Sequence, residues 1–385
     1  MTDSSVHARE RLRLEPPALQ GLIEILRSTG YQVYGPVVGN GGLVYGELAS
    51  VDDLPVGQTD IQGPGSYRFG PRDDDAWFGY AVGQQSWKRF LYEPATELWR
   101  AERKGHGVKL VPTRPDPAPM AFIGVRACEL AALAILDRVM LQGPYVAPIY
   151  QGRRGCMFLV AVQCGSPGDT CFCASMGTGP RVTSGADVTL TEVAEPGEHW
   201  FLAEAGSDQG AAALAGLVSR RATEAERARA DAVVARAASA MGRQVKVEGL
   251  AACLAARYEH PRWTHVASRC LGCANCTMVC PTCFCSTVED TTDLSGAEAS
   301  RWRRWDSCFT LEFSYIHGGS VRSSVLARYR QWLTHKFSTW VEQFGTFGCV
   351  GCGRCITWCP VGIDVTEEVR LLSEGYGTMS DAETA

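Results

Sequence analysis

Two cysteine runs with the same spacing constrain this chain more than any other feature of its sequence. Both read Cys-x2-Cys-x2-Cys-x3-Cys-Pro, and their members are Cys270, Cys273, Cys276 and Cys280 in the first run and Cys349, Cys352, Cys355 and Cys359 in the second. This is the spacing of cysteines that hold cubane [4Fe–4S] clusters. Structural zinc sites instead use two cysteine pairs separated by a longer loop. The sequence therefore predicts two [4Fe–4S] clusters.

The spacing within each run explains how one loop can wrap a cluster. Three thiolates at intervals of three residues let one tight turn reach three irons of the same cube. Gly272 and Gly351 allow the backbone to approach the sulfides, where amides can donate to sulfur. The fourth cysteine begins a new segment and ligates the other cluster. The expected ligand sets are Cys270, Cys273, Cys276 and Cys359 for cluster 1, and Cys349, Cys352, Cys355 and Cys280 for cluster 2.

The cysteine-rich part of the chain is expected to be a separate domain, because it holds 11 of the 17 cysteines. The 68 residues between Cys280 and Cys349 are too many for the compact two-fold ferredoxin. With their helical pattern over 321–344, they resemble the insert of α-helical ferredoxins in multi-subunit respiratory and hydrogenase-type enzymes. We therefore expect an α-helical, ferredoxin-like domain that binds two [4Fe–4S] clusters over residues 263–372, followed by a flexible tail over 373–385.

The preceding part of the chain alternates between strand and helix patterns. Its clearest unit is an apolar strand over 120–125 that runs into a helix over 130–140. Such alternation is typical of α/β layer architectures, so residues 14–218 are predicted to form an α/β domain. The polar residues 1–13 are expected to be a flexible tail. Residues 219–262, in part rich in Ala, Arg and Glu, are expected to be an exposed helical linker.

Four further cysteines fall on expected loop ends of the α/β domain: Cys128, Cys164, Cys171 and Cys173. Strand ends and helix N-termini gather at one edge of an open α/β sheet, where ligands bind. The four thiols are therefore candidates for a third metal centre, with a [4Fe–4S] cluster preferred and a tetrahedral zinc ion as the alternative. Burial of inert thiols explains them equally well, since free cysteine is among the most buried residue types.

The remaining features concern partners and location. Cys283, Cys285 and Cys308 either pack beside the clusters or supply alternative ligands. Arg and Trp residues interleave over 301–330, a pattern suited to nucleic acid or to a partner protein. The net charge of −5 favours the protein partner and argues against nucleic acid. A polar N-terminus, no apolar run long enough to span a membrane and abundant cysteine indicate a cytoplasmic metalloprotein.

Several motifs together resemble one family. They are GVRACEL at 124–130, CFCASMGTGP at 171–180, CPTCFC at 280–285 and WDSCF at 305–309, in addition to the two cysteine runs. This combination is similar to the β subunit of soluble, NAD(P)-linked, sulfhydrogenase-type [NiFe] hydrogenases and to a related component of anaerobic sulfite reductase. Ala127 and Glu129 depart from the Pro and Asp more common in such proteins.

The resemblance implies an electron-transfer subunit with no active site of its own. Its partners would be a flavin- and NAD(P)-binding subunit and the small and large hydrogenase subunits. The chain itself would bind neither NADP nor nickel. Two alternatives remain open at this point: a subunit that serves a sulfite or polysulfide reductase, and a stand-alone iron–sulfur oxidoreductase.

Overall fold

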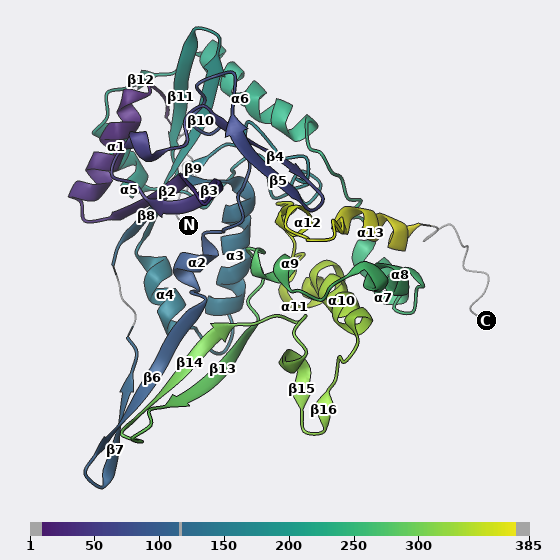
Figure 1. The fold of residues 1–385 in the computed structure, drawn as a ribbon. Helices are drawn as coiled ribbons and strands as arrows, with labels where there is room; N and C mark the ends of the chain where they lie inside the picture. The colour runs from purple at the N-terminus through teal and green to yellow at the C-terminus, as the bar shows by residue number, and fades with distance from the viewer. Residues whose placement is uncertain (1–9, 115–117, 375–385) are drawn as a thin grey trace, which may run out of the picture.

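The computed structural model describes residues 10–114 and 118–374, and its largest element is an eight-stranded mixed sheet in the order β12-β1-β11-β10-β9-β8-β2-β3 (Figure 1). The four central strands are parallel: β10 (Val188–Glu195), β9 (Met157–Val162), β8 (Met120–Val125) and β2 (Gln32–Gly39). The outer strands are antiparallel: β12 (Arg220–Arg221), β1 (Arg11–Leu14), β11 (Glu198–Ala205) and β3 (Gly42–Glu47). Every residue of β8 and β9 is buried, as expected for parallel strands covered on both faces.

Helices cover both faces of this sheet, which confirms the predicted α/β architecture of the N-terminal region. Ile123 of β8 and Val160 of β9 face α1 (Pro17–Ser28) and α5 (Asp208–Ala215). Phe122 and Leu159, one position earlier on each strand, face α3 (Ala127–Leu141) and α4 (Pro148–Gly155). The period-two alternation of strand side chains therefore divides the core into two layers.

Two segments expected to lie outside the α/β domain are parts of it. Strand β1 begins at Arg11, within the range expected as a tail, and pairs with β11 and β12. Residues 1–9 lie outside the described residues. Helix α6 (Glu224–Ser239), expected as an exposed linker, buries Ala230, Val234 and Ala237. Its apolar stripe consists mainly of alanines, so its pattern is weak although its packing is close.

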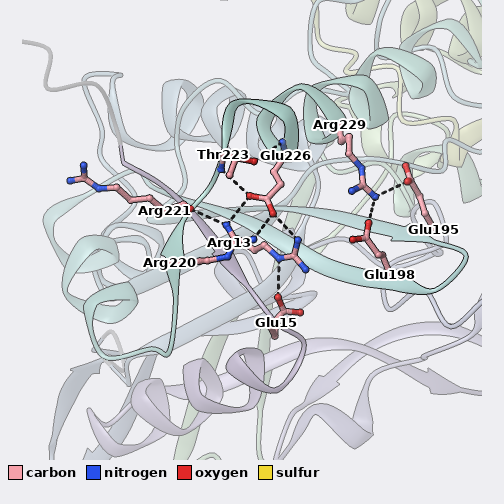
Figure 2. Close-up of polar contacts among 9 residues, drawn as sticks. All are labelled: Arg13, Glu15, Glu195, Glu198, Arg220, Arg221, Thr223, Glu226 and Arg229. Carbon is pink, nitrogen blue, oxygen red and sulfur yellow. Dashed lines mark hydrogen bonds and ion pairs between the residues drawn. The ribbon is translucent and has the colours of Figure 1, made fainter.

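Polar contacts fix the start of α6 against β1 (Figure 2). Thr223 and Glu226 form a capping box, in which each side chain bonds the other residue's backbone amide. Glu226 also accepts a hydrogen bond from Arg13 Nη1 at 2.7 Å. Farther along the helix, Arg229 pairs with Glu195 and Glu198 at the β10–β11 turn.

A second sheet joins the two halves of the chain, in the order β13-β14-β6-β7. Its strands are β13 (Ser286–Thr292), β14 (Glu298–Trp305), β6 (Ala95–Lys104) and β7 (Gly107–Pro112). It extends away from the large sheet as an arm (Figure 1). The expectation of a helical domain over residues 286–305 is therefore wrong. Residues 286–305 instead form the β13–β14 hairpin, and β14 pairs with β6 about 200 positions earlier in the chain.

The cysteine-rich part is mainly helical and has its own core, built around Leu254, Trp263, Leu333, Phe337 and Val369. Its helical segments are α7 (Leu250–Ala256), α8 (Arg262–Arg269), α9 (Asn275–Met278), α10 (Val325–Thr334), the π-helical turn η3 (His335–Thr339), α11 (Trp340–Phe344), α12 (Arg354–Thr357) and α13 (Val365–Ser373). Helix α7 belongs to this core rather than to a linker. Of the tail expected over 373–385, residues 375–385 lie outside the described residues.

Short elements complete the fold: the turns η1 (Val51–Asp53) and η2 (Glu312–Ser314), helix α2 (Lys88–Leu91), and the hairpins β4 (Gln58–Gly63) with β5 (Ser66–Pro71) and β15 (Tyr315–Ile316) with β16 (Gly319–Ser320). Within the described ranges, no helix has both the length and the apolar character needed to cross a bilayer.

Candidate iron–sulfur centres

The two cysteine runs line two adjacent cavities in the helical part of the chain. The thiols around the first cavity include those of Cys270, Cys273, Cys276 and Cys359. Those around the second are Cys280, Cys349, Cys352 and Cys355. The first cavity thus gathers three cysteines of the first run with Cys355 and Cys359 of the second, and the second cavity gathers three cysteines of the second run with Cys280 of the first. Cys355, Trp332 and Val365 line both cavities, so the two spaces share a wall.

The backbone of each run turns as a wrapping loop requires. Gly272 and Gly351 occupy the same position in their runs and have φ of +64° and +63°, in the left-handed region that glycine adopts readily. Their amides donate to the sulfurs of Cys270 and Cys349, each at 3.4 Å. The Ile363 amide likewise donates to Cys359 Sγ at 3.3 Å. Such amide–sulfur bonds stabilise negative charge on cluster ligands.

The two loops differ in their surroundings. In the first, Cys273 is exposed and Leu271 is 64% exposed. The second packs against the α/β region, where the Phe172 amide donates to the Gly351 carbonyl at 2.8 Å. A Cβ atom at Gly351 would lie 2.6 Å from the backbone of residues 172–173. One cavity therefore reaches the surface, and the other lies at the junction of the two halves.

A buried lysine lies beside the second cavity. Lys336 is 4% exposed, and its Nζ donates to Thr282 Oγ1 and to the Gly348 carbonyl, both at 3.0 Å. Among the described residues, no carboxylate lies within ion-pair distance of this ammonium group. A buried charge is costly unless an opposite charge compensates it. Four thiolates around an iron–sulfur cluster would supply that negative charge, so the residues present fit an anionic cluster.

The pKa of Cys280, the fourth cysteine of the first run, also fits an anionic cluster in the second cavity. The Cys283 thiol donates to Cys280, and together with the Lys336 charge it lowers the pKa of the Cys280 thiol well below its usual range. A lowered pKa favours the thiolate, which is the form that binds metal. Lys336 lies in the π-helical turn η3, a kind of irregularity frequent at functional sites.

An ion pair hidden from solvent holds the second run against helix α3. Arg354 Nη2 lies 2.6 Å from Glu129 Oε1, and the side chains are 0% and 1% exposed. Glu129 also accepts hydrogen bonds from Tyr45 Oη and Trp87 Nε1, and Arg354 donates to the carbonyls of residues 83 and 85. No local pattern signals this pair, because its members are 225 positions apart.

Comparison with known proteins agrees with these cavities. The profile of a 4Fe–4S dicluster domain matches residues 269–363, which span both cysteine runs. Sulfhydrogenase 2 subunit beta of Pyrococcus furiosus is 30% identical over 348 residues, which cover 89% of this chain and 92% of that protein. The chain belongs to the sulfhydrogenase β-subunit family. This confirms the resemblance, and the similarity extends well beyond the dicluster domain. No solved structure is significantly similar to the chain.

Membership in the sulfhydrogenase β-subunit family, together with a 4Fe–4S domain, makes the chain an electron-transfer protein with [4Fe–4S] clusters as cofactors.

The four cysteines suggested for a third centre lie close to one another in this member of the family. Cys128 is the second residue of α3, Cys164 follows β9, and Cys171 and Cys173 lie in the next loop. Burial, followed by the nearby Cys164 and Cys173 thiols, raises the pKa of Cys171. Burial with Cys164 and Cys352 beside it raises the pKa of Cys173 to about 12. The thiols are therefore near neighbours, and Cys352 of the second run adjoins them.

A second buried cation accompanies these thiols. Arg126 is almost fully buried and donates to the carbonyls of Phe78, Tyr80 and Gln163, and Cys164 lies within its electrostatic reach. No carboxylate of a described residue lies within ion-pair distance of its guanidinium. Across residues 10–114 and 118–374, no three His, Cys, Asp or Glu side chains converge tightly enough to hold a single metal ion, and this includes the cysteines of both runs.

The Arg- and Trp-rich segment lies partly in strand β14. Arg301 and Arg304 pair with Asp290 and Glu289 of the neighbouring β13, each at 2.7 Å. Arg303 is half-buried, stands 4.0 Å over the Tyr92 ring and donates to Thr96. Acidic side chains therefore compensate much of the basic charge that the sequence suggests for a docking surface.

Proposed function

We propose that the chain is the iron–sulfur electron-transfer subunit of a cytoplasmic, NAD(P)-linked [NiFe] hydrogenase complex. It relays electrons between the hydrogenase small and large subunits and a flavin- and NAD(P)-binding subunit. The observation that carries this proposal is the pair of adjacent cysteine-lined cavities, one at the surface and one at the junction with the α/β region. Family membership supports the hydrogenase assembly.

In this proposal the helical part is a ferredoxin-like domain with two [4Fe–4S] clusters, which supply one-electron oxidation and reduction. Cys270, Cys273, Cys276 and Cys359 hold one cluster, and Cys349, Cys352, Cys355 and Cys280 hold the other. Phe309, Tyr329 and Trp332 line the first cavity and exclude water from it. Lys336 compensates the charge of the second cluster. The exposed Cys273 side is the shorter route to a partner.

The test is to isolate the complex through a tag on this chain under anaerobic conditions. We expect hydrogenase and flavin subunits to co-purify and the complex to reduce NAD(P) with hydrogen. A sirohaem partner would instead indicate a sulfite reductase. Turnover by the chain alone would contradict a subunit that only relays electrons.

A third [4Fe–4S] cluster, held by Cys128, Cys164, Cys171 and Cys173, extends the relay into the α/β region. Electrostatic interactions link Cys173 to Cys128 and Cys164, and Cys171 to Cys164 and Cys173, and Cys352 adjoins them. Arg126 provides the compensating positive charge, as Lys336 does for the second cluster. A centre beside Cys352 would continue the path that begins at the exposed first loop.

Iron content tests the third cluster. Two cubanes hold about eight irons and three hold about twelve, and we expect about twelve in the anaerobically isolated chain. Cys171→Ser should lose about four of them, since a cubane needs four ligands. Cys253→Ser is the matched control, because Cys253 is a buried thiol outside all the ligand sets that donates to Leu372 O. About eight irons, unchanged by Cys171→Ser, would exclude the cluster, and stoichiometric zinc would identify the alternative.

A further inference from the structure

Three half-buried cysteines lie between the two runs in the sequence and belong to none of the ligand sets: Cys283, Cys285 and Cys308. Two of them meet at the base of the β13–β14 hairpin. Ser286, the first residue of β13, pairs with Trp305, the last residue of β14. Beyond this pair, the Asp306 amide donates to the Cys285 carbonyl at 2.9 Å. The two strands therefore stay together past the end of the ladder, and Cys308 follows two positions beyond Asp306.

The two thiols interact electrostatically there. The Cys308 thiol and backbone amide lie close enough to Cys285 to stabilise its thiolate, and the Lys336 charge lies nearby. The Cys308 thiol first, then the Lys336 charge and the Cys308 amide, lower the pKa of Cys285 to about 7 against the opposing effect of burial. A thiol that only packs in apolar surroundings has a raised pKa and is inert. Cys285 is instead poised as a nucleophilic thiolate with a second sulfur beside it.

Both members of the pair also lie close to the first cysteine run in the chain's contacts. Ser307 Oγ, next to Cys308, is hydrogen-bonded at 2.7 Å to Thr277 Oγ1, within the first run. Cys283, two positions before Cys285, interacts with Cys280, the fourth cysteine of that run, which lines the second cavity. Short, bonded connections therefore link the pair to both cavities.

We propose that Cys285 and Cys308 form a redox-active dithiol that exchanges two electrons with the iron–sulfur clusters. In the oxidising direction, both S–H bonds break, one S–S bond forms and two protons leave to solvent. The two electrons pass one each to two oxidised [4Fe–4S] clusters, and the reverse step cleaves the disulfide. The inference rests on the proposed function for its electron carriers. The dithiol adds a site that stores electrons in pairs to a series of clusters that each carry one electron.

Thiol trapping in the tagged complex tests this inference. Samples held reduced with dithionite or oxidised with ferricyanide are alkylated during unfolding and digested for mass spectrometry. We expect a 285–308 disulfide in the oxidised sample and alkylated Cys285 and Cys308 in the reduced one. Cys156 and Cys253 should be alkylated in both. Free Cys285 and Cys308 in both samples would overturn the proposal.

Two measurements separate this inference from the function on which it rests. In a coulometric titration, the native complex should accept two more electrons per copy of this chain than Cys308→Ser. Iron and sulfide contents should be equal in the two. Loss of iron in Cys308→Ser would make the residue a ligand and overturn the dithiol. Absence of iron from the native chain would overturn the proposed function itself.

The alkylation rate of Cys285 in the reduced native complex gives a further check. It should reach half its maximum near pH 7, because the neighbouring Cys308 thiol lowers this pKa. Cys308→Ala removes that thiol, so the midpoint should rise toward the ordinary thiol value of about 8.5. An unchanged midpoint would show that the two thiols do not interact.

Discussion

Cys359→Ala should eliminate the cluster at Cys270, Cys273 and Cys276, although these cysteines belong to the other run. Its sulfur lines the first cavity, and a missing thiolate leaves one iron of a cubane open and labile. We expect loss of about four irons per chain and loss of electron transfer from hydrogen to NAD(P). Iron and sulfide analysis with EPR spectroscopy of the reduced variant measures both consequences.

The converse variant and a distant thiol provide the controls. Cys280→Ala should remove the other cluster, because Cys280 lines the second cavity. Cys273→Ala and Cys352→Ala, each inside a single loop, assign the EPR signals to the two clusters. Cys156→Ala, at a thiol distant from both cavities, should leave all iron in place. If Cys359→Ala removed only the signal assigned by Cys352→Ala, the exchanged ligands would be wrong.

Arg354→Met should destabilise the protein by about 3–5 kcal/mol, the usual cost of removing one partner of a buried ion pair. The substitution leaves Glu129 charged and buried at the junction between helix α3 and the second cysteine run. Two neutral donors, Tyr45 and Trp87, compensate it only in part. Urea unfolding under anaerobic conditions measures the change in the free energy of unfolding.

An exposed ion pair offers the matched control. Arg301 and Asp290 are 2.7 Å apart, close to the 2.6 Å of the buried pair, but both side chains are about half exposed. Arg301→Met should therefore cost no more than about 1 kcal/mol. Adding Glu129→Leu to Arg354→Met should recover part of the lost stability, since no uncompensated charge then remains. Equal effects of Arg354→Met and Arg301→Met would show that the buried pair does not hold the two halves together.

Local patterns predict well the parts of this fold that depend on local geometry. The ferredoxin spacing brings eight cysteines to two cavities because each loop needs only its own turn residues and one distant ligand. The strand β8 and helix α3 are equally visible, since an apolar strand and a helix of ordinary length follow each other directly.

The remaining features depend on contacts between distant segments. The pairing of β14 with β6, the Arg354–Glu129 ion pair and the position of Lys336 leave no periodic trace in the sequence. Helix α6 resembles a linker in sequence because alanines form its buried stripe and contribute little to an apolar pattern. Cys285 and Cys308 come near each other because β13 pairs with β14. The sequence predicts helices in this segment, so it does not reveal this proximity.

The redox state of the clusters in the intact complex tests the proposed relay most directly. EPR spectra would be recorded on the tagged complex as isolated, after exposure to hydrogen alone, and after addition of NAD(P). The signals removed by Cys273→Ala and Cys352→Ala identify the clusters of this chain. We predict that hydrogen reduces these clusters and that NAD(P) then reoxidises them. Clusters that dithionite reduces but hydrogen leaves oxidised would contradict a relay between the hydrogenase and the flavin subunit.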